Sequence, residues 1–274
     1  MDSLGSEPRR SIPAWSAILA AIVGTGLMFG ASVVLGRSLP LRSTIVVASG
    51  LLAVPSLVAL LFHRVPVAAG LALGPVARRS ALLAMAAGLG LWVASLGLIE
   101  LQYALWAPPE GYLEAFRQLH EALRPRNPLD ALWSAIAIAA APAVFEEITV
   151  RGVLLPSLRP WLGGAGAVVA SSVVFALMHA DPYRFAFTFA VGLALGALRL
   201  RTAALWPSIL AHATLNTLTF AAAPWLDDPS QPLPDPRPWL GGGLLIVGAL
   251  ASLAAFRALG RPLTPSETGP RLAA

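Results

Sequence analysis

Two adjacent carboxylates and an arginine lie inside an apolar stretch of the sequence, residues 129–156. Charged side chains are costly inside a membrane, so Glu146, Glu147 and Arg151 are expected to be paired or to do chemistry. Glu147 and Arg151 are four residues apart, which places them on one helix face where they can form an ion pair. Glu146 points about 100° away. We therefore expect Arg151 to neutralise Glu147 and Glu146 to remain available as a general base.

Two further apolar stretches each contribute a histidine. His179 follows Phe175 by four residues and Asn216 follows His212 by four, so each pair shares a helix face. A carboxylate and an imidazole can activate water, and His and Asn side chains can donate hydrogen bonds to an oxyanion. These are the groups that amide hydrolysis requires. The alternative is structural, with a buried ion pair that fixes helix packing and histidines that only bond to their neighbours.

The order of these residues resembles a known family. Successive stretches carry Glu146-Glu147-x-x-x-Arg151, then Phe175-x-x-x-His179, then His212-x-x-x-Asn216. This pattern resembles the CAAX protease and bacteriocin-processing family, also called the abortive-infection or type II CAAX prenyl endopeptidase family of intramembrane proteases. The resemblance covers about residues 129–222, and three motifs in register make it specific. Many bacterial members have Phe directly before the motif arginine, where this chain has Val150.

The resemblance implies an intramembrane endopeptidase of glutamic type, built on about eight helical spans. Glu146 with His179 would activate the hydrolytic water, and His212 with Asn216 would stabilise the tetrahedral oxyanion. The supporting residues would be Glu147, Arg151 and Phe175.

Other mechanisms and functions stay open at this point. Family members have also been called metalloproteases, and a zinc site could use His179, His212 and Glu146 with a water molecule. We favour a mechanism without metal or other cofactor, because the amide of Asn216 is a natural oxyanion donor and an uncommon zinc ligand. A proton-coupled transporter, with Glu and His as a relay, and a catalytically silent scaffold or immunity protein are the other candidates.

The composition predicts an integral membrane protein. The chain of 274 residues is 57% hydrophobic and 12% charged, with a mean hydropathy of +0.72. It has no cysteine, which excludes disulfides, thiolate zinc sites and cysteine nucleophiles. All 19 basic residues are arginines scattered over the loops rather than clustered in a stripe, so we do not expect nucleic-acid binding.

Eight stretches are long and apolar enough to span a bilayer, which predicts an all-α transmembrane bundle. They are residues 13–35, 44–62, 81–105, 129–156, 162–179, 184–200, 203–222 and 238–257. In residues 107–128, Tyr112, Phe116 and Leu119 recur at helical spacing, which predicts an interfacial amphipathic helix. It is either a connector on the bilayer surface or a gate over a substrate opening.

These elements divide the chain into six parts. They are an N-terminal tail (1–12), N-terminal transmembrane helices (13–105), the interfacial segment (106–128), the catalytic core (129–222), a loop with the last transmembrane helix (223–261) and a C-terminal tail (262–274).

The arginines in the loops and the overall composition predict the orientation of the chain and the membrane in which it lies. With eight spans, the loops on the side of the termini carry 11 arginines and the opposite loops carry 7, which predicts cytoplasmic termini. The arginine- and alanine-rich composition indicates a GC-rich bacterial genome, and hence the bacterial inner membrane. Expected partners are the bilayer and a membrane-anchored protein or peptide substrate, such as a leader peptide or a C-terminal sorting tail.

Overall fold

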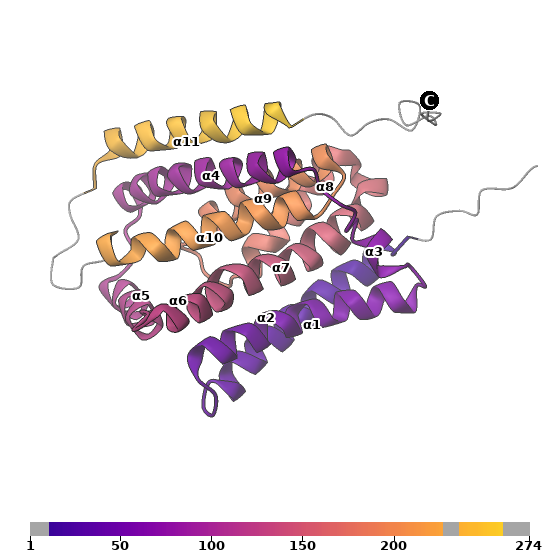
Figure 1. Ribbon diagram of the computed structural model, residues 1–274, viewed down its shortest axis with the longest axis horizontal. Coiled ribbons are helices and arrows are strands. Elements are labelled where there is room, and N and C mark those ends of the chain that lie inside the picture. Colours follow the sequence, from indigo (N-terminus) through magenta and orange to yellow (C-terminus); the bar gives the residue numbers. More distant parts are fainter. Residues whose placement is uncertain (1–10, 227–235, 260–274) are drawn as a thin grey trace, which may run out of the picture.

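The computed structural model describes residues 11–226 and 236–259, all of which form helices and their connections. Most of the predicted tails, and most of the loop predicted at the start of the 223–261 part, lie outside the described residues. Figure 1 shows the arrangement. In chain order the elements are α1 (Ala14–Leu35), α2 (Leu41–Phe62), α3 (Val67–Gly70), α4 (Arg78–Leu105), α5 (Glu110–Leu123), α6 (Pro128–Ala135), η1 (Ile136–Ala140), α7 (Ala141–Glu147), η2 (Ile148–Leu154), α8 (Leu155–Leu177), α9 (Phe185–Thr202), α10 (Trp206–Leu226) and α11 (Pro238–Ala258).

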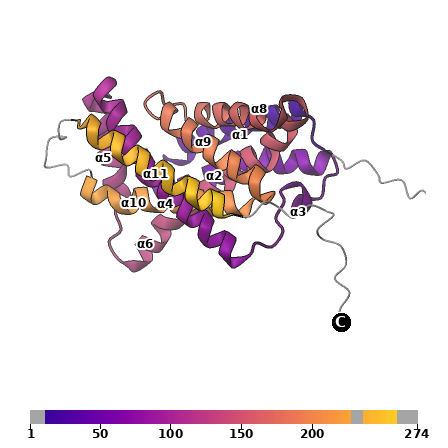
Figure 2. The same ribbon diagram turned by 90° about the horizontal axis from the view of Figure 1, so that it is seen from above.

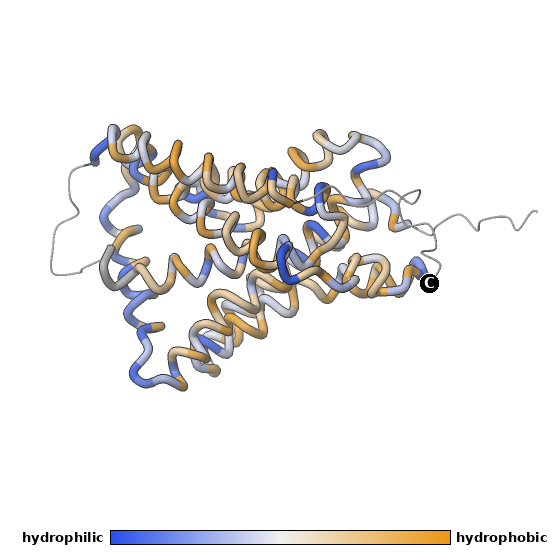
Figure 3. The backbone as a smooth tube through the Cα atoms, turned by 45° about the horizontal axis from the view of Figure 1, so that its top comes forward, coloured by the Kyte–Doolittle hydropathy of each residue, from blue (hydrophilic) through white to orange (hydrophobic). Residues whose placement is uncertain are grey.

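The predicted all-α membrane architecture is confirmed, but the count of eight spans is not. Six helical stretches among the described residues are long and apolar enough to cross a membrane: α1, α2, α4, Pro128–Leu177, α9 and α11. Hydrophobic residues run along the helices and hydrophilic residues gather mainly toward their ends (Figure 3). The protein is therefore a multi-pass integral membrane protein.

The predicted fourth and fifth spans lie in one long helical stretch, which begins at a capped start. The Asn127 side chain accepts a hydrogen bond of 2.9 Å from the backbone N–H of Asp130, and Pro128 occupies the first turn. The stretch is interrupted only at Gly163, whose φ of 67° is not helical. Glycine adopts this conformation without a steric penalty, so the chain can change direction there.

Two π-helical segments flank the Glu146–Glu147 pair. The first, η1, ends two residues before Pro142, and the second, η2, ends two residues before Pro156. Proline lacks the N–H that would close the preceding α-helical turn, and its ring clashes with the carbonyl there. A wider turn is one way to accommodate both defects, and such bulges recur at functional sites.

The helices lie in layers, with the motif-bearing elements in the centre. In Figure 1, α1 and α2 form a pair at the bottom and α11 lies on α4 at the top. Between the two pairs, α7 packs against α2 and α10, and α10 packs against α4 and α9. The side chains of Glu147 on α7 and His212 on α10 are therefore buried between neighbouring helices.

The bundle has two ends, which the views in Figures 1 and 2 place far apart. The α3 end comprises α3, the ends of α2, α9 and α11, the start of α4 and the break in α8. There the Leu205 N–H donates to the Ala72 carbonyl (3.2 Å), and the Arg201 Nε–H donates to the Leu259 carbonyl (3.0 Å). The described arginines at this end are Arg64, Arg78, Arg79, Arg159, Arg199, Arg201 and Arg257.

The α5 end comprises α5, the starts of α2, α6, α9 and α11 and the end of α4. Arg42 of α2 donates from Nη2 to the Leu123 carbonyl of α5 (3.2 Å) and from Nε to Ser134 Oγ of α6 (2.7 Å). Gln102 Nε2 of α4 donates to the Tyr183 carbonyl before α9 (2.7 Å). The interfacial segment thus forms the predicted helix, and it is tied to the bundle at this end.

Close packing of α4 on α11 depends on small residues. A Cβ added to Gly248 of α11 would lie 2.2 Å from the backbone nitrogen of Ala94 and 2.5 Å from the carbonyl oxygen of Gly90. Gly97 of α4 approaches Gly241 of α11 in the same way. Inside a membrane, such close backbone approach replaces the hydrophobic effect as a source of helix association.

This packing predicts opposite effects for two substitutions in the same helix. Gly248→Ala should destabilise the bundle by about 1–3 kcal/mol, because the new methyl group overlaps the α4 backbone. Gly243→Ala should leave stability unchanged or raise it, since a Cβ there meets nothing within 4 Å and alanine favours helix. Thermal unfolding in detergent micelles measures both. Equal melting temperatures for the two variants would contradict the packing argument.

Candidate active site

The structure brings the three motifs together at the centre of the bundle. Glu146 and Glu147 end α7, and Arg151 lies in the following η2 segment. Phe175 lies near the end of α8, with His179 in the turn that follows, and His212 lies on α10. Ring contacts and ion pairs link these residues, which are up to 66 positions apart in the sequence.

Glu147 and Arg151 form the predicted ion pair. Arg151 Nη1 lies 2.7 Å from Glu147 Oε1, and both side chains are completely buried. The guanidinium also donates from Nη2 to the Gly192 carbonyl of α9 (3.0 Å) and lies 4.5 Å above the Phe175 ring. One arginine therefore joins η2 to α8 and α9, and its charge is compensated within the bundle.

His212 is fixed by the same carboxylate. Its Nδ1 lies 3.0 Å from Glu147 Oε1, and its Nε2 lies 3.8 Å from Glu146 Oε2. A carboxylate held by an arginine accepts a hydrogen bond, so Nδ1–H is the donor and the ring presents Nε2 toward Glu146. The sequence placed His212 and Asn216 on one face but gave no sign that Glu147 would orient the imidazole.

Glu146 is the carboxylate left without a partner. Its Oε2 is buried, has no hydrogen bond among the described residues and faces His212 at 3.8 Å. The side chain is 15% exposed, whereas that of Glu147 is not exposed at all. The two adjacent glutamates thus differ as their helix positions predicted, with one neutralised and the other available.

His179 is also oriented by a backbone group. Its Nδ1 lies 2.8 Å from the Phe175 carbonyl, so Nδ1–H donates and Nε2 is the acceptor in the neutral ring. Phe175 meets both histidine rings edge to face, with centroids 5.0 Å from His179 and 5.8 Å from His212. His179 also interacts electrostatically with Glu146. Phe175 therefore spaces the two imidazoles around the free carboxylate.

Asn216 lies one turn after His212 on α10 and is partly buried. Within the part of the chain that the structure describes, its side chain has no hydrogen-bond partner. A primary amide whose N–H groups are not already bonded can donate a hydrogen bond to a ligand that enters the site.

The described residues contain no preformed metal site. No group of three or more His, Asp and Glu side chains in residues 11–226 and 236–259 is placed to hold a metal ion. His212 Nδ1 is engaged by Glu147, which leaves only Nε2 for any other role. The mechanism proposed below therefore uses the side chains alone, and the zinc-dependent alternative stays a prediction.

Tyr112 of α5 binds the turn after His179 through a hydrogen bond and a ring contact. The Tyr112 hydroxyl donates to Asp181 Oδ2 (2.7 Å), and Asp181 Oδ1 accepts from the backbone N–H of Tyr183 (2.9 Å). The Tyr183 ring lies 4.6 Å from Trp106 and 4.9 Å from Tyr112. Burial and the hydrogen bond to Asp181 raise the pKa of Tyr112 above its usual value, so the hydroxyl remains a donor at neutral pH. The sequence predicted the helix but not this contact.

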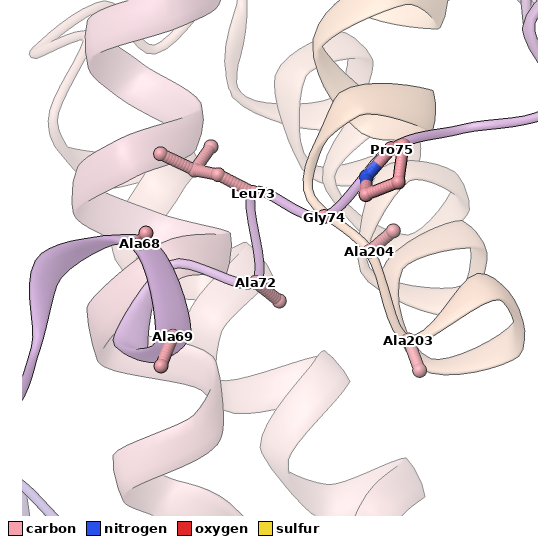
Figure 4. Close-up of a pocket in the computed structure, with 8 residues that line it drawn as sticks. All are labelled: Ala68, Ala69, Ala72, Leu73, Gly74, Pro75, Ala203 and Ala204. Atoms are coloured by element: carbon pink, nitrogen blue, oxygen red, sulfur yellow. The ribbon is translucent and has the colours of Figure 1, made fainter.

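A pocket of about 580 Å³ lies at the α3 end, away from these residues (Figure 4). None of its lining side chains can titrate or form a hydrogen bond, so we assign no catalytic role to it. It is lined by Ala68, Ala69, Ala72, Leu73, Gly74, Pro75, Ala203 and Ala204.

The buried pair predicts a stability effect at Arg151. Arg151→Met should lower the free energy of unfolding by about 3–5 kcal/mol, because it leaves the Glu147 charge buried and unpaired. Adding Glu147→Gln to that variant should restore part of the loss by removing the charge. Thermal unfolding in micelles, with the exposed Arg37→Met as control, measures this. An Arg151→Met variant as stable as the control would contradict it.

The hydrogen bond between α5 and the turn after His179 predicts an energetic coupling between Tyr112 and Asp181. Tyr112→Phe should destabilise the protein by about 1 kcal/mol through loss of one hydrogen bond. In a double-mutant cycle with Asp181→Ala, Tyr112→Phe should cost little in the Asp181→Ala background, since the acceptor of its hydrogen bond is already absent. Strictly additive effects on the melting temperature would show that the contact contributes nothing.

Comparison with known proteins agrees with this geometry. Residues 128–218 match the family model described as Rce1-like, type II CAAX prenyl endopeptidase Rce1-like. No curated protein and no solved structure gives a significant match. The matched segment contains all three motifs, from Glu146 to Asn216. The resemblance predicted from these motifs is therefore confirmed, since residues 128–218 are similar to the Rce1-like model of the type II CAAX prenyl endopeptidase family.

Proposed function

We propose that this protein is a glutamate-dependent intramembrane endopeptidase that cleaves a membrane-associated protein or peptide. The family match supports a protease of this general kind. The observation that carries the residue assignment is the unpartnered Oε2 of Glu146, buried between helices and facing His212. An unpaired buried carboxylate is costly to retain for packing alone, and it suits a general base.

In the proposed reaction, a water molecule lies between Glu146 and His179. Its oxygen forms a bond to the peptide carbonyl carbon while one of its protons passes to Glu146. His179 accepts a hydrogen bond from the water at Nε2, because Nδ1–H is held by the Phe175 carbonyl. The C–N bond then breaks, and the proton on Glu146 passes to the leaving nitrogen. The products are a carboxylic acid and an amine.

The oxyanion that forms at the carbonyl oxygen needs donors, which His212 and Asn216 would supply. The Asn216 side-chain amide has a free N–H for this purpose. His212 donates from Nε2 only when both ring nitrogens carry protons, and the carboxylates of Glu146 and Glu147 lie beside those two nitrogens. Glu147 and Arg151 thus act through His212, as positioning residues.

We further propose that the protein lies in a bacterial inner membrane with cytoplasmic termini. The support is the arginine excess on the side of the termini and the arginine-rich composition. Leader peptides, membrane-anchored precursors and C-terminal sorting tails are the substrate classes that suit this location. The transporter and silent-scaffold alternatives gain no specific support from the described residues.

Cleavage assays on a library of membrane-anchored peptides test the proposal. Glu146→Gln and His179→Ala should each lower the cleavage rate by about 10²–10⁴-fold, and Asn216→Ala by about 10²–10³-fold. Each variant should keep a melting temperature near that of the wild type, because none of these side chains takes part in the buried Glu147–Arg151 pair. Glu114→Gln, on the exposed face of α5, is the matched control.

Two results would contradict the mechanism. A Glu146→Gln variant with the wild-type rate would remove the proposed base. Loss of wild-type cleavage in a zinc chelator, with recovery on adding zinc, would replace the metal-free route.

A further inference from the structure

The two ends of the bundle carry the same number of described arginines but differ in acidic residues. At the α5 end, arginines form ion pairs with Asp130, Glu114 and Glu121. At the α3 end, the described residues include no Asp or Glu. Its seven arginines are therefore not balanced by any described carboxylate.

Arg201 and Arg199 differ in their hydrogen bonding. Arg201 is satisfied by the Leu259 and Arg257 carbonyls and by the Phe256 ring. In contrast, Arg199 Nε is buried and has no hydrogen-bond partner among the described residues. The positive charge of Arg159 acts on the Arg199 guanidinium, so two like charges repel each other here. This arrangement is unfavourable unless an anion lies between them.

The local fold explains why the two arginines meet. The helix break at Gly163 brings the end of the long stretch against the last turn of α9, where a Cβ on Gly164 would lie 3.4 Å from Leu200 Cδ1. Arg159 lies one turn before the break, and Arg199 precedes Leu200. The pair thus lies where α8 and α9 pack against each other.

Neighbouring side chains indicate the depth of this site in the membrane. Trp161 is 79% exposed and Leu162 is 49% exposed, and both lie directly after Arg159. Exposed Trp beside Arg at a span end is typical of the interface between lipid tails and headgroups. The arginine pair therefore lies at the level of the lipid phosphates.

We propose that Arg159 and Arg199 bind the phosphate group of an anionic phospholipid. Phosphate oxygens accept several hydrogen bonds from guanidinium groups, and the anion cancels the repulsion between the two charges. Basic sites between helices at the cytoplasmic surface bind anionic headgroups in this way. A lipid is favoured over free phosphate because Trp161 and Leu162 provide an apolar surface for acyl chains next to the pair.

A lipid bound here would brace the helices that frame the catalytic cluster. From the break, α8 leads to Phe175 and His179, while α9 supplies the Gly192 carbonyl that binds Arg151. The proposal does not depend on proteolysis, since it concerns the stability of the folded bundle.

The test measures lipid-dependent stability of the full chain in nanodiscs. Replacing part of the phosphatidylcholine by phosphatidylglycerol should raise the melting temperature of the wild type, as for any ligand of the folded state. Arg159→Gln and Arg199→Gln should each weaken lipid binding about fivefold, measured by native mass spectrometry. Arg78→Gln, exposed at the same end, and Arg37→Gln, at the opposite end, should keep wild-type binding.

The other outcomes distinguish the alternatives. Equal losses in Arg78→Gln and Arg159→Gln would overturn the site in favour of diffuse attraction to the surface. An equal gain in stability from inorganic phosphate in phosphatidylcholine discs would overturn the lipid assignment. Full phosphatidylglycerol binding by the Arg159→Gln/Arg199→Gln double variant would overturn the proposal altogether.

Discussion

The buried ion pair between Glu147 and Arg151 is the interaction on which the central cluster of motif residues depends. Two charges removed from water are costly, and their attraction offsets this cost only when the geometry is good and the remaining donors are used. Here Arg151 also bonds to the α9 backbone and lies over Phe175, while Glu147 also accepts from His212. The pair thus fixes four elements, α7, α8, α9 and α10, relative to one another.

Much of this could be predicted from the sequence, because the relevant signals are local. The four-residue spacing predicted the Glu147–Arg151 pair. The order of the three motifs predicted the family. The assigned catalytic roles and the domain boundaries stay predictions, since nothing in the geometry tests them.

Other features could not be predicted, because they depend on contacts between distant residues or on backbone detail. Periodicity shows that His212 lies on a helix face but not that Glu147 orients its ring. A continuous helix to Leu162, with the break at Gly163, differs from the predicted gap at residues 157–161 because local apolarity does not report a single positive φ. The contact between Tyr112 and Asp181 spans 69 residues and leaves no sequence pattern.

An unsatisfied polar atom does not by itself identify a functional residue. Glu147 Oε2 and Arg151 Nε also lack partners, yet other atoms of both side chains are bonded. Glu146 differs because no atom of its carboxylate has a hydrogen bond among the described residues, although an imidazole nitrogen lies 3.8 Å away. A gap of that size between a carboxylate and an imidazole exceeds a direct hydrogen bond, and a water molecule can bridge it. The same cluster that uses one glutamate to hold helices together therefore leaves the carboxylate of its neighbour without a hydrogen bond among the described residues, which is the basis of the role proposed for Glu146.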